Sequence, residues 1–248
     1  MGTAERKQRQ RGERENLILQ VARRMLIQRG YHGLTMDRIA EEIEYSKGTV
    51  YQHFSSKEDL LCAMTIEMLQ DILSCLRRAA AFPGRPRERL TAMAVGGQLL
   101  FRLNPDRFQA QQVLWVSSLA ERTSAPRQAA LDRLHGQMIG LFRQILDEAV
   151  RSGDLVLPAG VDPRHVAHGM RSMLIGAEIM RRIPGDAIVF EGLRPDVSVR
   201  KNLQVFFDGL GWRPLSTEWD YDATVRRVLT EVFPAEYAQL KGAKQDLL

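Results

Sequence analysis

The sequence predicts an all-α fold, and three observations support this prediction. Apolar residues recur at i, i+3, i+4 and i+7 along most of the chain, which is the period of an amphipathic helix. Proline and glycine interrupt the pattern where helices would end. The longest alternating run, residues 187–190, is too short to carry a sheet. With 248 residues, 44% hydrophobic and 26% charged, the chain has the composition of an ordinary globular protein.

The first helix is expected over residues 14–29, where apolar side chains form one face and Gly30 follows as a C-cap. That face comprises Leu17, Ile18, Val21, Ala22, Met25 and Leu26. Residues 1–13 precede this helix and are rich in Arg and Lys. They are expected to form a basic, flexible arm.

Residues 34–61 are expected to form two short helices, a tight turn between them and the start of a third helix. Thr35 is a good N-cap for the first helix, because its hydroxyl can accept from free backbone N–H groups. The apolar face of that helix is formed by Ile39, Ala40 and Ile43. Residues 44–46 end it and supply the cap of the second helix. Ser56 caps the third helix, with Asp59 completing a start similar to a capping box.

The second short helix, Lys47 to about Phe54, has a thin apolar stripe. It buries only Val50 and Phe54, which lie one turn apart. Its other side chains are donors or short polar groups, namely Lys47, Thr49, Tyr51, Gln52 and His53. Such a helix is poorly explained as core and is well suited to the major groove of DNA. A net charge of +5 is compatible with nucleic acid.

The run SKGTVYQHF from Ser46 to Phe54, followed by SKEDL at 56–60, resembles the DNA-binding domain of the TetR family of bacterial regulators. One departure is Glu44, where the family usually has a glycine, which adopts positive φ freely. The resemblance implies an N-terminal three-helix domain with a helix-turn-helix over 14–62. It also implies a helical ligand-binding and dimerisation domain over 63–248.

The resemblance further implies roles for individual residues. Phosphate contacts would fall to Thr35, Tyr51, His53 and Lys57, and groove or base contacts to Lys47, Gly48, Thr49 and Gln52. Chemistry agrees for Gln52, which can bind adenine through two hydrogen bonds, and for Lys47, which can reach guanine acceptors. Gly48 has no side chain and would let the helix approach the bases closely. The arm of residues 1–13 is either a solvated tail or a segment that follows the DNA backbone or enters the minor groove.

The third helix is expected to continue to residue 81, and six further helices are predicted from their start and stop signals, such as Asn104-Pro105 and Pro184-Gly185. These helices span residues 57–81, 86–103, 105–121, 126–152, 163–182, 195–210 and 220–232. The first of these would join the two domains and is a candidate route for coupling them. The aromatic residues that follow residue 211 indicate that the C-terminal segment packs against the fold.

Methionine and aromatic residues are numerous in the second domain, and methionine suits irregular binding surfaces. The candidate ligand-binding residues are Met68, Phe101, Trp115, Met138, Phe142, Met173 and Glu178. For any single apolar residue among them, ordinary helix core is the better explanation. The resemblance favours a small-molecule effector, and an apolar lining favours a mostly hydrophobic one, with Glu178 orienting a polar end.

Two late helices carry small residues and a wide apolar face that another helix could approach. The candidate dimerisation residues are Val166, Gly169, Met173, Gly176, Val199, Leu203, Phe206 and Leu210. The pattern alone fits packing within the chain equally well. The resemblance, in which late helices form a four-helix dimer interface, favours a homodimer.

Catalytic and metal-binding signals are weak. The chain contains no nucleophile elbow, zinc-protease motif, P-loop or dinucleotide fingerprint, so we expect no enzyme. Cys62 and Cys75 fall in one predicted helix about 20 Å apart and cannot pair. His165 and His168 could chelate a metal, but no flanking Asp, Glu or Cys completes a site. We therefore expect no metal and no cofactor.

The sequence thus favours a homodimeric regulator that binds double-stranded DNA, is typically a repressor, and releases a pseudo-palindromic site when a small molecule binds. The alternative is a helical enzyme or carrier in which the motif is incidental. No apolar run approaches the roughly 20 residues needed to span a bilayer. No apolar segment of a signal peptide is found in the first 15 residues. We therefore expect a cytoplasmic protein that does not enter the membrane.

Overall fold

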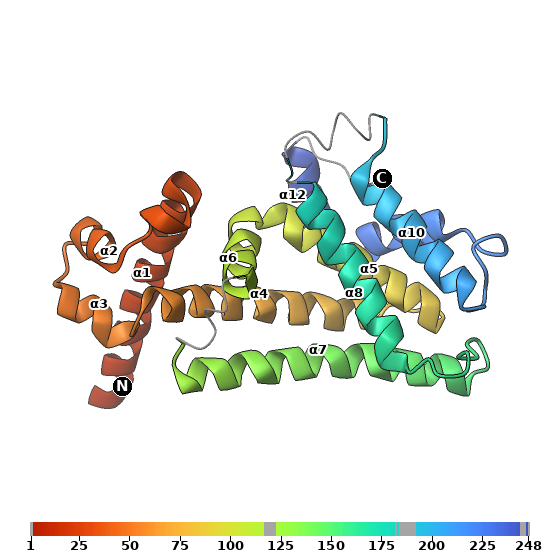
Figure 1. Cartoon of the computed structure of the whole chain (residues 1–248), viewed down its shortest axis with the longest axis horizontal. Helices are drawn as coiled ribbons and strands as arrows, with labels where there is room; N and C mark the ends of the chain where they lie inside the picture. Colours follow the sequence, from red (N-terminus) through yellow and green to blue (C-terminus); the bar gives the residue numbers. More distant parts are fainter. Residues whose placement is uncertain (1, 117–122, 182, 184–191, 244–246, 248) are drawn as a thin grey trace. The chain divides into compact units, whose positions relative to one another are not determined.

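The computed structural model describes residues 2–116, 123–181, 183, 192–243 and 247. Every regular element within these residues is helical, so the all-α prediction is confirmed (Figure 1). The strand-like run 187–190 and the predicted helix end at 117–121 lie outside the described residues. Among the residues that are described, no helix combines the length and hydropathy needed to cross a membrane.

The helix boundaries follow the caps and breakers closely, and Figure 1 labels most of the helices. The elements are α1 (Thr3–Gly33), α2 (Met36–Glu42), α3 (Lys47–His53), α4 (Lys57–Ala80), α5 (Pro86–Leu103), α6 (Pro105–Val116), α7 (Ala125–Arg151), α8 (Pro163–Met180), α10 (Pro195–Gly209), α11 (Tyr221–Arg227), the π-helical turn η2 (Val228–Val232) and α12 (Pro234–Gly242).

Helix α1 is longer than expected, because it begins at Thr3 rather than near residue 14. The segment expected to be a flexible arm is therefore helical. Ion pairs one turn apart, Arg9 to Glu13 at 2.9 Å and Arg11 to Glu15 at 3.2 Å, support this extension. Gly30 interrupts the helix with a φ of 65°, at the position predicted for the C-cap.

The chain divides into two compact units. Unit 1 contains residues 1–70 and 104–134, and unit 2 contains residues 71–103 and 135–248. This division differs from the expected boundary at residue 62, because α6 and the start of α7 belong to the N-terminal unit. The reason is packing, since α6 lies on α1 and Val113 rests against the N-terminal core.

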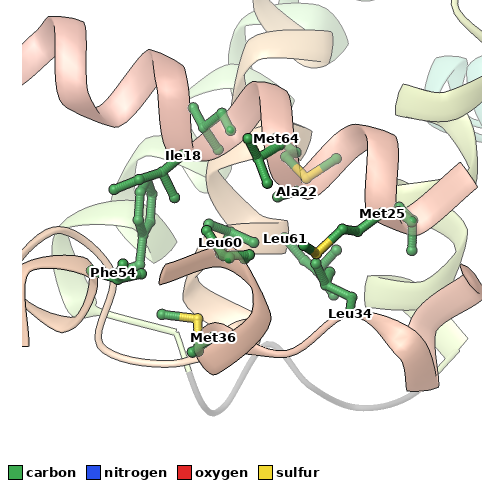
Figure 2. Close-up of a cluster of buried hydrophobic side chains, with 14 of the residues drawn as sticks. Ile18, Ala22, Met25, Leu34, Met36, Phe54, Leu60, Leu61 and Met64 are labelled. Carbon is green, nitrogen blue, oxygen red and sulfur yellow. The ribbon is translucent and has the colours of Figure 1, made fainter. Parts of the chain in front are cut away.

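The core of unit 1 is a closely packed apolar cluster contributed by α1 to α4. Figure 2 shows Ile18, Ala22 and Met25 of α1 pointing toward Leu60 and Leu61 of α4. Phe54, Leu34 and Met36 close the cluster from the helix-turn-helix side, and all three are buried (Figure 2). This core fixes the position of α3 relative to α1 and α4.

Unit 2 is built around α5, which is buried along most of its length. Helices α11 and α12 pack against it. Gly96 permits close packing of Cys75 on α4 and of Phe233, the N-cap of α12, because a Cβ there would lie 2.5 Å from Cys75 Sγ and 2.9 Å from Phe233 Cζ. Arg87 is fully buried and donates to the carbonyl oxygens of Trp212 and Pro214. The segment beyond residue 211 is therefore an integral part of unit 2.

Candidate functional site

The two short helices of unit 1 are held by the caps that the sequence predicted. Thr35 Oγ1 accepts from Arg38 N at 3.3 Å and starts α2. Ser46 Oγ accepts from Thr49 N at 3.1 Å and starts α3. Between them Glu44 has a φ of 56°, which is the left-handed conformation that glycine adopts more readily. The turn therefore keeps its shape although the residue in it is not glycine.

Helix α3 presents one apolar side to the core and a polar side to solvent. Val50 and the following Phe54 are buried in the cluster of unit 1. Lys47, Gly48 and Gln52 are exposed, and Tyr51 is 49% exposed. Of the predicted groove-facing residues, Lys47, Gly48 and Gln52 thus lie on the exposed side of one short helix, which has the size and chemistry to enter a major groove. Thr49 is half-buried, and its hydroxyl is hydrogen-bonded to Ser46 Oγ at 2.8 Å.

Gly48 is not required by the packing of α3. A Cβ built there would have only Ser46 Oγ near it, at 3.8 Å, which is ordinary van der Waals contact. The backbone of Gly48 also has negative φ and sits within a helix, where alanine is favoured over glycine. The lack of a side chain at this exposed position is thus unexplained by the fold and fits close approach of a partner.

Lys47 forms an ion pair with Asp37, with Nζ 2.6 Å from Oδ2. The hydrogen bond that Lys47 donates to Asp37, together with the negative charge of that carboxylate, raises the pKa of Lys47 above the ordinary value. The sequence did not predict this pair, because Asp37 and Lys47 lie ten positions apart on two different helices. Both side chains are at least half exposed, so breaking this ion pair costs little free energy.

Lys57 lies further inside unit 1 than a simple phosphate ligand would. Its Nζ donates to the carbonyl oxygen of Tyr31 at 3.1 Å and sits 3.7 Å from the centroid of the Tyr31 ring. Partial burial lowers the pKa of this ammonium below the ordinary value. The predicted phosphate contact of Lys57 therefore requires the side chain to leave Tyr31 or to bridge both acceptors.

His53 is buried at the end of α3, with Nδ1 3.2 Å from Oε1 of Glu15 on α1. Beside it lies an open groove of about 230 Å³. The groove is lined by Lys7, Gln10, Arg11 and Arg14 of the α1 extension and by Gln52 and His53 of α3. The basic residues of the expected arm thus form a wall next to the exposed side of α3. Their helical spacing in the sequence could have indicated this face.

The candidate ligand residues do not form one site in the described residues. Phe101 and Glu178 line the same small cavity of unit 2, of about 10 Å³, while Met68 and Met138 are simply buried. Phe142 and Met173 are half-buried, and the side chain of Trp115 lies outside the described residues. The other residues around the cavity are Gln98, Leu174, Ala177, Arg181, Pro195, Asp196 and Val199.

That cavity is more polar than the sequence suggested. Glu178 forms an ion pair with Arg181, with Oε1 2.5 Å from Nη2, and Asp196 pairs with Arg102. Burial raises the pKa of Asp196 above the ordinary value, against the opposing effect of Arg102. At this size the cavity holds about one water molecule.

Some of the candidate dimerisation residues pack within the single chain, and the others are half-exposed. Val166, Val199 and Leu203 are buried within the single chain, so they do not offer a surface to a second one. Gly169 accommodates the ring of Phe206, since a Cβ there would lie 3.0 Å from Cζ. The remaining candidates, Met173, Gly176, Phe206 and Leu210, are half-exposed. Part of this apolar pattern therefore serves packing between α8 and α10.

Comparison with known proteins identifies the region that carries this site. A family model described as bacterial regulatory proteins, tetR family, matches residues 18–64. The activator FasR of Mycolicibacterium smegmatis is 38% identical over 82 residues, which is 33% of this chain and 37% of FasR. The regulator UidR of Escherichia coli is 30% identical over 139 residues, 56% of this chain and 67% of UidR. The match to FasR therefore spans well under half of that relative.

Solved structures extend the likeness beyond the helix-turn-helix. The structure of the TetR family regulator PfmR from Thermus thermophilus superposes with a TM-score of 0.58 at 21% identity, covering 78% of this chain and 98% of PfmR. At this identity the likeness concerns the fold. Members of this family are regulators and not enzymes. Together with the capped two-helix frame and its exposed α3, these likenesses place the chain in the TetR family of DNA-binding transcriptional regulators.

Proposed function

We propose that the protein is a homodimer that reads a pseudo-palindromic operator with one α3 in each of two major grooves. The single observation that carries this proposal is the outward side of α3. Lys47, Gly48 and Gln52 are exposed there, while Val50 anchors the helix from behind. Two copies related by a twofold axis would address half-sites about one helical turn apart or somewhat more.

Within this interface we assign base contacts to Lys47, Gly48, Thr49 and Gln52, and phosphate contacts to Thr35, Tyr51, His53 and Lys57. The groove beside His53 adds Lys7, Arg11 and Arg14, which lie along one side of α1. Three guanidinium or ammonium groups next to a base-reading helix suit the phosphates flanking the contacted bases. The α1 extension would therefore lengthen the footprint of each subunit.

The proposed dimer interface is the outward side of α8 and α10. Val205 is 70% exposed, Met180 is 43% exposed and Ile179 is 39% exposed. The half-exposed Phe206 lies on the same helix as Val205, and the half-exposed Leu210 is the C-cap of that helix. Apolar side chains of this size are depleted on surfaces that face only water, so their grouping on two adjacent helices supports a protein interface.

The proposed effector is a small molecule with an apolar body and a polar end. Phe101, Leu174 and Val199 supply apolar lining to the cavity of unit 2, while Glu178 and Asp196 supply polar groups. Because the cavity is smaller than a ligand, binding requires the surrounding helices to separate. A ligand that selects this opened state would lower operator affinity through linkage, which is the behaviour of a repressor acting in the cytoplasm.

The test is selection of DNA by the purified full-length protein from a pool of random duplexes. A palindromic site is expected to be enriched, and its affinity should fall steeply with salt as phosphate contacts release counterions. Gln52→Ala should relax the base preference at one position in each half-site, whereas Tyr51→Ala should weaken binding to all DNA sequences alike. Failure to enrich any site would refute the proposed operator reading.

A further inference from the structure

The residues that begin α7 pack against the segment of unit 1 where α3 ends and α4 begins. Ser124 donates to Asp59 Oδ1 from its backbone N at 2.9 Å and from its hydroxyl at 2.7 Å. Arg127 forms an ion pair with the same carboxylate. Its second guanidinium nitrogen, Nη2, donates to the carbonyl oxygen of His53 at 3.3 Å. Residues more than sixty positions apart in the sequence are thus in direct contact.

Arg127 contacts the end of α3 in two ways. It binds the carbonyl of His53, which is the last residue of the helix, and its Cζ lies 4.7 Å from the ring centroid of Phe54. A guanidinium suits this position because its planar fork donates in two directions and stacks on an aromatic ring. A lysine ammonium at the same place could satisfy the carboxylate or the carbonyl, but it would not stack in the same way.

Asp59 does more here than begin α4. Its local capping role needs only Ser55 N, which donates to Oδ2 at 3.1 Å, and Ser56 Oγ, which accepts from Asp59 N at 2.9 Å. The contacts with Ser124 and Arg127 are additional and come from the first turn of α7 and the residue that precedes it. Asp59 is 1% exposed. Burial opposes its charge, but these donors outweigh burial and hold its pKa below the ordinary value.

We propose that Arg127 is a positioning residue for DNA reading, and that Asp59, Ser124 and Arg127 form a latch holding the end of α3. Helix α7 runs from unit 1 into unit 2 as one continuous helix. A displacement of α7 would therefore reach the reading helix at the latch, in addition to any signal carried by α4. This inference rests on the proposed role of α3 in reading DNA.

The test combines hydrogen exchange of the free protein with operator binding. In Arg127→Gln the amides of α3 should exchange roughly tenfold faster, because charge-assisted bonds to buried partners are lost. Affinity for the DNA site selected from random duplexes should fall at least tenfold. The matched control is Arg133→Gln, an exposed position on α7 with the same charge change, which should leave both measurements as in the parent.

A conservative variant separates positioning from stability. Arg127→Lys keeps the ion pair with Asp59, so its melting temperature should return toward that of the parent while exchange in α3 stays fast. Unchanged α3 exchange in Arg127→Gln would overturn the latch, as would equal acceleration throughout the core of unit 1. If the parent itself retains no DNA, the operator reading fails, and the exchange measurement still decides the latch.

Discussion

Gly48→Ala separates the needs of the fold from the needs of DNA reading. The nearest atom to a new Cβ would be Ser46 Oγ at 3.8 Å, so the protein accommodates the methyl group without rearrangement. Alanine is favoured over glycine in a helix by about 0.5–1 kcal/mol. The variant should therefore be as stable as the parent or slightly more stable. Its melting temperature should rise by up to about 2–4 °C for a protein of this size.

Operator affinity should change in the opposite direction. Gly48 is exposed on the side of α3 that carries Lys47 and Gln52, where the added methyl group would meet the base edges. A misfit at a base contact typically costs about 1–3 kcal/mol, and a dimer would suffer it in both half-sites. We expect at least a tenfold loss of affinity, measured by fluorescence anisotropy with a labelled duplex carrying the selected site.

Gly140→Ala on α7 is the matched control for that variant. No atom lies within 4 Å of a Cβ built at Gly140, and the residue is in the interior of a long helix. It should gain a similar stability and bind DNA as the parent does. If Gly48→Ala binds as tightly as Gly140→Ala, the backbone of α3 does not approach the bases closely and the assignment of Gly48 is wrong.

Three further variants address the electrostatics and the assembly. Asp37→Asn removes the partner of Lys47 and a negative charge near the DNA, so operator affinity should increase and its salt dependence should steepen; weaker binding would contradict the proposed role of Lys47. Asp59 has a lowered pKa, so its stabilisation is present above the unfolded pKa near 3.9 and is lost as pH falls through the lower folded pKa. Asp59→Asn should thus have a lower free energy of unfolding than the parent at neutral pH, and this difference should narrow below about pH 4 in urea titrations. A difference that does not depend on pH would refute this reasoning. Val205→Glu should convert a dimer to a folded monomer in light scattering, and an unchanged dimer would place the interface elsewhere.

The helix-turn-helix could be predicted because its signals are local. Thr35 and Ser46 cap helices whose apolar spacing is visible within a few residues, and the structure confirms both caps. The helical extension of α1 was not predicted although Arg9 and Glu13 stand one turn apart, because a short, strongly basic run is also typical of a disordered tail. Local patterns therefore sufficed where caps were present.

Contacts between distant segments could not be predicted in the same way. Asp59 was recognised as part of a helix start, but nothing near it in the sequence indicates Ser124 or Arg127. Similarly, the apolar pattern of α8 and α10 does not say whether its partner belongs to the same chain. Val166 and Leu203 face their own core, while Val205 faces outward. A single sequence carries no information on that distinction.

The left-handed conformation of Glu44 has a consequence for how the angle between α2 and α3 is set. A residue other than glycine disfavours this conformation by roughly 1–2 kcal/mol, so the residues of the turn do not by themselves favour the observed backbone geometry. The buried Ile39 and Val50 on either side impose it through the core. Helices α2 and α3 thus form one rigid unit. Substitutions in the turn should leave the angle between the two helices unchanged, and the unit should change its orientation only as a whole.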